Sequence, residues 1–137
     1  LFAQNIKKIT IISEMADPLG QDVNVFCEES NISIDFSLDL QHVVEDLDVI
    51  YMNTIAYLGD SYRKLGTRFE LSTNSGLKKN AVILHPFARN NELSTDLDNT
   101  NHNLYFNQAD GAVFIRQALL LAIFDRTPKV LNSDLQP

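Results

Sequence analysis

The stretch Asn80–Asp96, NAVILHPFARNNELSTD, contains an aliphatic run that stops at a histidine and a proline. The segment Ala81–Leu84 is short, apolar and followed by proline, a pattern that predicts a buried β-strand. A polar loop with one arginine, Arg89, and one glutamate, Glu92, comes next. This loop therefore leaves the end of a core strand, and its polar groups lie close to that end.

The preceding sequence alternates between strand-like and helix-like segments. This alternation predicts an α/β fold with a doubly wound parallel sheet, Rossmann-like and three-layered. Ligands of such sheets bind at the carboxyl ends of the strands, which here follow Tyr51 and Leu84. The predicted strands are Lys8–Ser13, Ile32–Phe36, Asp48–Asn53 and Ala81–Leu84, and the predicted short helices are Asp22–Ser30 and Asp39–Glu45, the latter capped by Asp39.

The carboxyl-terminal third is predicted to be helical. Two helices are expected, Asn101–Ala109 and Gly111–Asp125, separated at Asp110-Gly111. The second is apolar on most faces, so we expect it to pack on more than one side. The other expectations are the tail of a helix at Leu1–Asn5, a helical turn at Ser61–Leu65, an extended piece at Phe69–Leu71 and a loop at Asn91–Thr100.

Composition narrows the function classes. The chain has 137 residues, which favours one domain, and a net charge of −7, which argues against a nucleic-acid partner. Cys27 is the only cysteine, so no disulfide framework and no thiolate metal site is expected, and a cytoplasmic or organelle-interior protein is favoured over a secreted one. No apolar run approaches the roughly 18 residues of a membrane span.

The segment Leu77–Phe124 resembles the carboxyl-terminal part of aspartate carbamoyltransferase catalytic chains. That family reads His-Pro-Leu-Pro-Arg, Thr-Asp-Val-Asp, Tyr-Phe-x-Gln-Ala and Phe-x-Arg-Gln-Ala-Leu-Leu, and this chain reads HPFAR, TDLD, YFNQA and FIRQALL. The stretch DLDVIYMNT, residues 46–54, is similar to the family's Asp-Val-Leu-Tyr-Met-Thr-Arg. Ornithine-specific relatives carry His-Cys-Leu-Pro, so His85-Pro86 points to the aspartate branch. The resemblance implies that residues 1–137 form a single incomplete aspartate-binding domain that lacks its first strand and helix.

The resemblance also implies a reaction: transfer of the carbamoyl group of carbamoyl phosphate to the amino group of aspartate, early in pyrimidine synthesis. The family uses no metal or organic cofactor. The backbone carbonyls of Pro86 and Phe87 are expected to accept hydrogen bonds from the carbamoyl nitrogen. The full set of substrate-binding candidates is His85, Pro86, Phe87, Arg89, Asn53 and Thr54.

The sequence departs from the family at several positions of this site. The second proline of His-Pro-Leu-Pro is Ala88, and the arginine expected to bind an aspartate carboxylate is Thr54. A glutamine two residues later is Ala56, and an acidic loop residue is Asn91. Threonine cannot replace the bidentate, charge-assisted contact of an arginine.

Several polar residues have a structural alternative to a functional role. His85 lines a ligand pocket or is a hydrogen-bonded structural group, and Arg89 holds substrate or pairs with Glu92. Asp96 and Asp98 are more often caps and turn residues than a paired-carboxylate metal site. His102 is expected to cap a helix that starts near Thr100, Arg116 to form a structural ion pair, and Tyr105-Phe106 to be core or interface residues.

Two functions remain open. The first is a transferase half that is active only when a partner chain or segment supplies the carbamoyl-phosphate domain and the central strand. The second is a catalytically dead relative kept as a structural or regulatory subunit, which the residues at 54, 56 and 88 favour. In either case we expect an oligomer, and carbamoyl phosphate and aspartate are the ligands of an active form.

Overall fold

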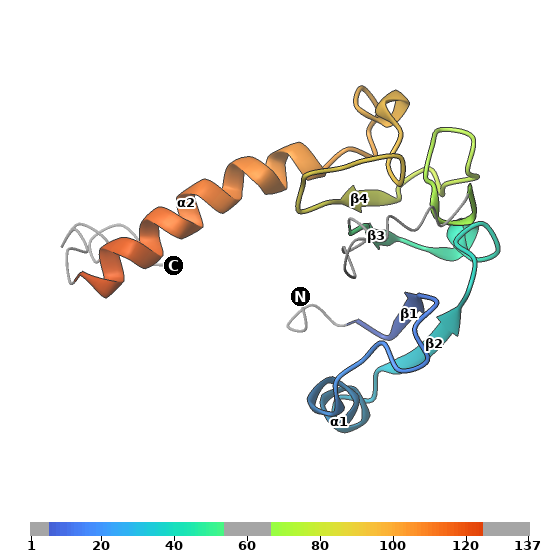
Figure 1. Cartoon of the computed structure of the whole chain (residues 1–137), viewed down its shortest axis with the longest axis horizontal. Coiled ribbons are helices and arrows are strands. Elements are labelled where there is room, and N and C mark those ends of the chain that lie inside the picture. The colour runs from blue at the N-terminus through green and yellow to red at the C-terminus, as the bar shows by residue number, and fades with distance from the viewer. Residues whose placement is uncertain (1–5, 54–66, 125–137) are drawn as a thin grey trace, which may run out of the picture.

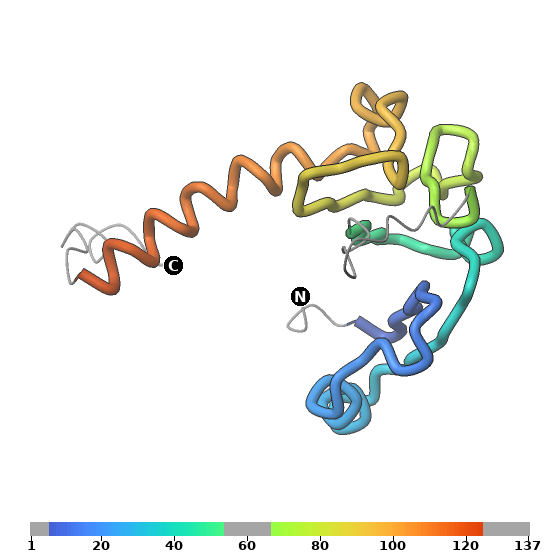
Figure 2. Tube along the Cα trace, in the orientation of Figure 1, coloured from blue at the N-terminus to red at the C-terminus, as the bar shows by residue number. Residues whose placement is uncertain are grey.

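The computed structural model describes residues 6–53 and 67–124 of the chain. Short strands and one helix form a curved body, from which a long second helix extends (Figures 1 and 2). The elements are β1 (Lys8–Ile12), α1 (Gln21–Glu29), β2 (Ser33–Ser37), β3 (Val49–Tyr51), β4 (Val82–Leu84) and α2 (Tyr105–Ile123), with single 3-10 turns at Val44–Asp46, Thr67–Phe69 and Thr95–Leu97.

The four strands form two separate parallel pairs. β1 pairs with β2 in a register that places Ile9 opposite Ile34, and β3 pairs with β4 with Ile50 opposite Ile83. The fold is therefore α/β with parallel strands, as the sequence predicts, and it is a truncated Rossmann-like unit. In a doubly wound sheet the first strand lies in the middle, so a domain without it is expected to fall into these two pairs.

The two pairs leave different edges open. The outer side of β4 is covered, because the Ile83 amide donates to the His102 carbonyl (2.8 Å) and the Leu104 amide donates to the Ile83 carbonyl (3.1 Å). Within residues 6–53 and 67–124, β3 pairs with β4 alone and β1 with β2 alone. Between the described strands, the open edges of β1 and β3 are thus the ones that a central strand would occupy.

Helix α1 ends in a Schellman motif with an asparagine at the left-handed position. Asn31 adopts a left-handed conformation, with φ of 54°. The Ile32 amide donates to the Cys27 carbonyl (2.9 Å) and the Asn31 amide to the Glu28 carbonyl (3.2 Å), which is the hydrogen-bond pattern of a Schellman motif. Cys27 and Ile32, which such motifs bring together, are both buried. Asparagine tolerates the left-handed region, so it ends the helix and directs the chain into β2.

The hydrophobic core lies around the β3–β4 pair. Its buried side chains come from both strands, from the turns on either side of β3 and from the loop after β4. Burial of this apolar surface is the main stabilising contribution, at about 25 cal/mol per Å². The members are Leu40, Val44, Ile50, Leu71, Ile83, Leu93, Leu97 and Tyr105.

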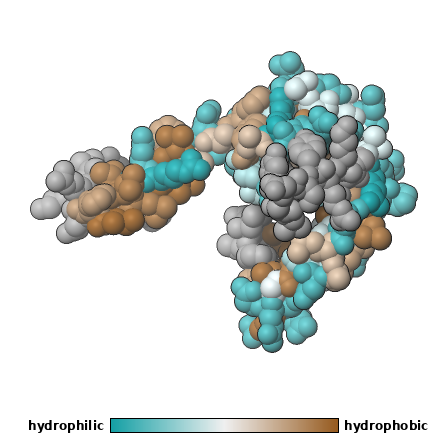
Figure 3. Space-filling view, viewed as in Figure 1, coloured by the Kyte–Doolittle hydropathy of each residue, from teal (hydrophilic) through white to brown (hydrophobic). Residues whose placement is uncertain are grey.

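Two predictions for the carboxyl-terminal third are wrong: the break at Asp110-Gly111 and the packing of the second helix on several sides. Helix α2 runs without interruption through Asp110 and Gly111, because a glycine inside a helix costs only about 1 kcal/mol relative to alanine and leaves the i→i−4 hydrogen bonds intact. Its apolar side chains are not packed on several sides: among the described elements α2 packs only on β4. Most of its length is exposed and hydrophobic (Figure 3). None of the described helices has the length and apolar character required to cross a membrane.

Smaller segments differ from their predictions in part. The predicted helix Asp39–Glu45 is a turn followed by the 3-10 turn Val44–Asp46, although Asp39 does accept a hydrogen bond from the Gln41 amide (2.9 Å). Only Leu71 of the predicted extended piece is strand-like, forming an isolated bridge with Leu93. The predictions for residues 1–5 and 61–65 lie outside the described residues.

Two isoleucines give a matched test of where the core lies. Ile83 is fully buried, whereas Ile123 is 72% exposed. In urea unfolding of the chain, Ile83→Ala is expected to lower the free energy of unfolding by roughly 2–5 kcal/mol and Ile123→Ala by less than about 0.5 kcal/mol. An equal loss in both variants would show that the far end of α2 is covered in solution.

Candidate functional site

The carboxyl ends of β3 and β4 lie side by side. Tyr51 is in register with Leu84, and the Met52 amide donates to the Leu84 carbonyl (2.9 Å). Asn53, which follows, is exposed, and Thr54 lies outside the described residues. The two strand ends that the sequence singles out are therefore neighbours, and the loop after β4, residues 85–92 (the β4 loop), begins at this edge.

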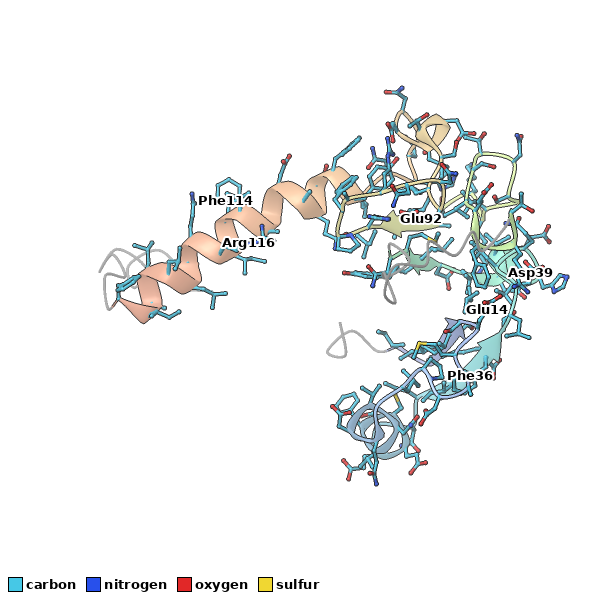
Figure 4. All side chains as sticks on the ribbon, in the orientation of Figure 1. Glu14, Phe36, Asp39, Glu92, Phe114 and Arg116 are labelled. Atoms are coloured by element: carbon cyan, nitrogen blue, oxygen red, sulfur yellow. The ribbon has the colours of Figure 1, made fainter. Side chains whose placement is uncertain are left out.

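A buried histidine–glutamate contact closes the β4 loop. His85 and Glu92 have side chains that are 0% and 4% exposed, and His85 Nε2 lies 2.9 Å from Glu92 Oε1. The same oxygen accepts a hydrogen bond from the Asn90 amide (2.9 Å). Figure 4 shows Glu92 projecting into the part of the body that surrounds β4. Both ends of the loop are thereby tied to one carboxylate.

The first residues of the β4 loop are held against the start of α2. The His85 amide donates to Gln108 Oε1 (2.9 Å) and the Phe87 amide to His85 Nδ1 (2.9 Å). Phe87 has a φ of 58°, and the Phe87–Ala88 peptide bond is cis. The Phe87 ring stacks on Phe106, with centroids 5.7 Å apart and planes at 9°, and meets Tyr105 edge-on at 5.9 Å. These rings fix Phe87 without using its backbone carbonyl.

Arg89 forms a bidentate pair with Asp98. Arg89 Nη1 and Nη2 lie 2.5 and 2.7 Å from the two Asp98 carboxylate oxygens, and both side chains are mostly buried. The Tyr105 hydroxyl donates to the same carboxylate (2.7 Å). The expected alternative pairing of Arg89 with Glu92 is wrong, because the Glu92 carboxylate faces His85. Sequence proximity favoured Glu92, whereas the fold brings Asp98 to the guanidinium.

The electrostatics of this cluster follow from its contacts. The hydrogen bond from Arg89 is the main cause that holds the pKa of Asp98 below its usual value, while burial opposes it. The same hydrogen bond raises the pKa of Arg89. Burial first, and then the hydrogen bond to Asp98, raises the pKa of Tyr105 to about 12. Arg89 and Asp98 are thus both charged near neutral pH, and each satisfies the other.

The β4 loop leaves two acceptors open. Among the hydrogen bonds between described residues, none ends on the carbonyl oxygen of Pro86 or of Phe87. Both residues are at least partly accessible to solvent. Two adjacent carbonyls at the end of a strand can receive two N–H groups of a small ligand.

Of the remaining polar candidates, His102 and Asp96 have structural partners. His102 does not cap a helix: α2 begins at Tyr105, and His102 Nδ1 lies 2.7 Å from the Ala81 carbonyl oxygen, which ties this segment to β4. Asp96 accepts hydrogen bonds from the Thr73 amide (3.2 Å) and hydroxyl (2.6 Å), which lower its pKa. Arg116 is exposed on α2 (Figure 4) and forms no ion pair with any described acidic group.

Sequence reasoning did not single out Gln108 or assign Asp98 to Arg89. Gln108 orients the first amide of the β4 loop from a helix 23 residues downstream. Its only sequence signal is its place in the motif YFNQA, where the glutamine follows two aromatic residues at helical spacing. Asp98 gave no signal beyond its place in the TDLD motif.

Comparison with known proteins places this geometry in a family. A sequence model for the "Aspartate/ornithine carbamoyltransferase, Asp/Orn binding domain" matches residues 8–123. The chain belongs to this family. The aspartate carbamoyltransferase catalytic subunit of Wigglesworthia glossinidia brevipalpis is 32% identical over 124 residues, which are 87% of this chain and 40% of that protein. The corresponding subunit of Methanobrevibacter smithii is 35% identical over 94 residues, 66% of this chain and 30% of that protein.

Solved structures show the same fold. Aspartate transcarbamoylase from Trypanosoma cruzi in complex with carbamoyl phosphate superposes with a TM-score of 0.70 at 23% identity, covering 84% of this chain and 40% of that one. The same enzyme with carbamoyl phosphate and aspartate gives a TM-score of 0.69 at 22% identity. This chain of the carbamoyltransferase family thus spans well under half the length of the relatives it matches.

The Arg89–Asp98 pair predicts a specific acid dependence of stability. Because the folded-state pKa of Asp98 is lowered, its contribution is present above the unfolded pKa, about 3.9, and is lost as pH falls through the lower folded value. Asp98→Asn is expected to cost roughly 1.5–3 kcal/mol at pH 7 and less below pH 4. Urea unfolding between pH 2 and pH 7 measures this, with Asp110→Asn on exposed α2 as the control. A constant cost of Asp98→Asn across that range would contradict the assignment.

Proposed function

We propose that residues 1–137 form the aspartate-binding-like part of an aspartate carbamoyltransferase-like protein, and that the β4 loop binds the carbamoyl group. In the family reaction the amino nitrogen of L-aspartate bonds to the carbamoyl carbon, the bond from that carbon to the phosphate oxygen breaks, and phosphate leaves with the electron pair. The amino nitrogen gives up one proton, which the departing phosphate can accept. N-carbamoyl-L-aspartate is the product. Family membership and the β4 loop geometry support this proposal, and no step of it requires a metal.

The open carbonyls of Pro86 and Phe87 carry the proposal. A carbamoyl NH₂ group has two N–H donors, and two neighbouring acceptors on a buttressed loop match that pattern. Preorganised acceptors orient the planar group for attack without reorganisation at the moment of reaction. His85, Arg89, Asn53 and Thr54 are the other candidates for substrate contact. In this chain His85 and Arg89 contribute by shaping the loop, because their polar atoms are engaged with Glu92, Phe87 and Asp98.

The proposed binding of aspartate has less support from the sequence than the proposed binding of the carbamoyl group. Threonine at 54 and alanine at 56 remove the polar groups that the family resemblance places there, and Ala88 replaces a loop proline. These three residues favour a second candidate function, that of a structural or regulatory subunit without transferase activity. Both candidates require more than residues 1–137, since these residues span well under half the length of the relatives they match. We propose that the protein acts as an oligomer.

We further propose that a strand from a partner chain or from another segment of the protein inserts between β1 and β3. In β3, alternate residues direct their amide and carbonyl groups toward β4. The Val82 amide donates to the Asp48 carbonyl, and the Met52 amide donates to the Leu84 carbonyl. By that alternation the Val49 and Tyr51 amides face away from β4. In β1, the Ser13 amide donates to the Ser37 carbonyl, so the amides at positions 10 and 12 face away from β2.

Amide hydrogen exchange tests the inserted strand with internal controls. In the chain alone, the amides of Val49 and Tyr51 are expected to exchange fast and that of Ile50 slowly. In the native assembly the outward amides, including those of residues 10 and 12, should slow by about tenfold or more, because each gains a hydrogen bond in a buried sheet. Slow exchange of the outward amides in a monomeric chain would argue against the missing strand.

Calorimetry with a bisubstrate phosphonate analogue separates the two candidate functions. The native assembly is expected to bind the analogue weakly, and Thr54→Arg to bind it about tenfold more tightly by gaining a bidentate carboxylate contact. Thr54→Lys is the control, because it adds the charge without the planar fork and should gain less. Absence of binding in both the unmodified assembly and Thr54→Arg would support the structural or regulatory subunit.

A further inference from the structure

His85 and His102 differ in whether the Nδ1 atom of the ring carries a proton. The backbone N–H of Phe87 points at His85 Nδ1 from 2.9 Å, so this nitrogen accepts and carries no proton. Nε2 then carries the proton and donates to the Glu92 carboxylate. In His102, Nδ1 faces the Ala81 carbonyl oxygen at 2.7 Å, and a carbonyl oxygen only accepts. His102 therefore carries its proton on Nδ1.

The contact at His85 Nδ1 sets the direction of a carbonyl. The Phe87 N–H and the Pro86 C=O belong to one peptide unit, which is planar and trans, so the two bonds point in opposite directions. The cis bond of this loop is the following one. Because the N–H points at a fully buried imidazole, the Pro86 carbonyl points away from that ring and the core around it.

The ring itself is fixed from both sides. Nε2 is held by Glu92 Oε1, which also receives the Asn90 amide, and the backbone of His85 is held by Gln108. A ring flip would replace both hydrogen-bonding nitrogens by carbon atoms, so the Glu92 oxygen would lose the imidazole donor and the Phe87 amide would lose its acceptor. Losing two hydrogen bonds at a buried site is costly, so the ring has one stable orientation.

We propose that His85, as the neutral imidazole protonated on Nε2, is a positioning residue that aims the Pro86 carbonyl at the carbamoyl group. This inference rests on the proposed ligand role of the β4 loop. His85 does not touch the reacting atoms; it acts through the Phe87 amide.

Nitrogen-15 NMR of the histidine rings tests the tautomer in the native protein. His85 is expected to show an unprotonated Nδ1 and a protonated Nε2 near neutral pH, while His102 shows a protonated Nδ1 in the same spectrum. A protonated Nδ1 in His85 would overturn the inference without any variant, so the test does not depend on the folding of a mutant.

Two substitutions separate the two ring atoms. His85→Asn places an amide oxygen close to the position of Nδ1 and keeps the acceptor for Phe87. His85→Gln reaches the position of Nε2 and keeps the donor to Glu92, but it loses that acceptor. We expect Phe87 amide exchange to rise roughly 2- to 10-fold more in His85→Gln than in His85→Asn, with a similar split in affinity for the bisubstrate analogue.

The outcomes of these measurements distinguish the two proposals. Equal effects of His85→Asn and His85→Gln on Phe87 exchange and on analogue binding would reduce His85 to a structural group and overturn the inference alone. Failure of the unmodified assembly to bind the analogue would remove the proposed function, and with it the purpose assigned to His85.

Discussion

The contact between His85 and Glu92 is the interaction on which the shape of the β4 loop depends. A carboxylate in the core costs several kcal/mol unless its charge is met by well-placed donors. Here one oxygen receives the imidazole Nε2–H and the Asn90 amide, so the loop returns to the strand end that it left. The second ring nitrogen then receives the Phe87 amide. One buried pair thus holds the two ends of the loop together and sets the direction of the Pro86 carbonyl.

Around this pair, the first turns of α2 pack against the β4 loop and hydrogen-bond to it. Tyr105 and Phe106 pack against the Phe87 ring, Gln108 holds the His85 amide, and the Tyr105 hydroxyl joins the Arg89–Asp98 pair. The remainder of α2 leaves the body with its apolar side chains exposed (Figure 3). The same helix thus holds the β4 loop with its first turns and exposes apolar side chains along the rest of its length.

The open edges of β1 and β3 indicate that the described residues are part of a larger sheet. Unpaired strand edges in the middle of a fold expose amides and carbonyls that a sheet normally satisfies. In the half formed by β1, α1 and β2, the buried apolar residues are Cys27 and Ile32, while the β3–β4 half holds the core. The contact of Arg68 with Glu14 links the two halves, but an exposed ion pair of this type contributes at most about 1 kcal/mol. Among the described strands and helices, no element of one half packs against an element of the other.

Local patterns in the sequence were enough to predict the strands, the helix that ends before Asn31 and the resemblance to the family. Strands of three to five residues are dictated by β-branched runs, and Asn31 marks the helix end, because both depend on neighbours along the chain. The continuity of α2 was not accessible in this way, because the cost of Gly111 is small against eighteen other helical residues. The partners of Arg89, His85 and His102 were not accessible either. They lie 9, 7 and 21 residues away, and which polar groups meet depends on how the β4 loop folds back over the core, a long-range packing outcome that no local pattern encodes.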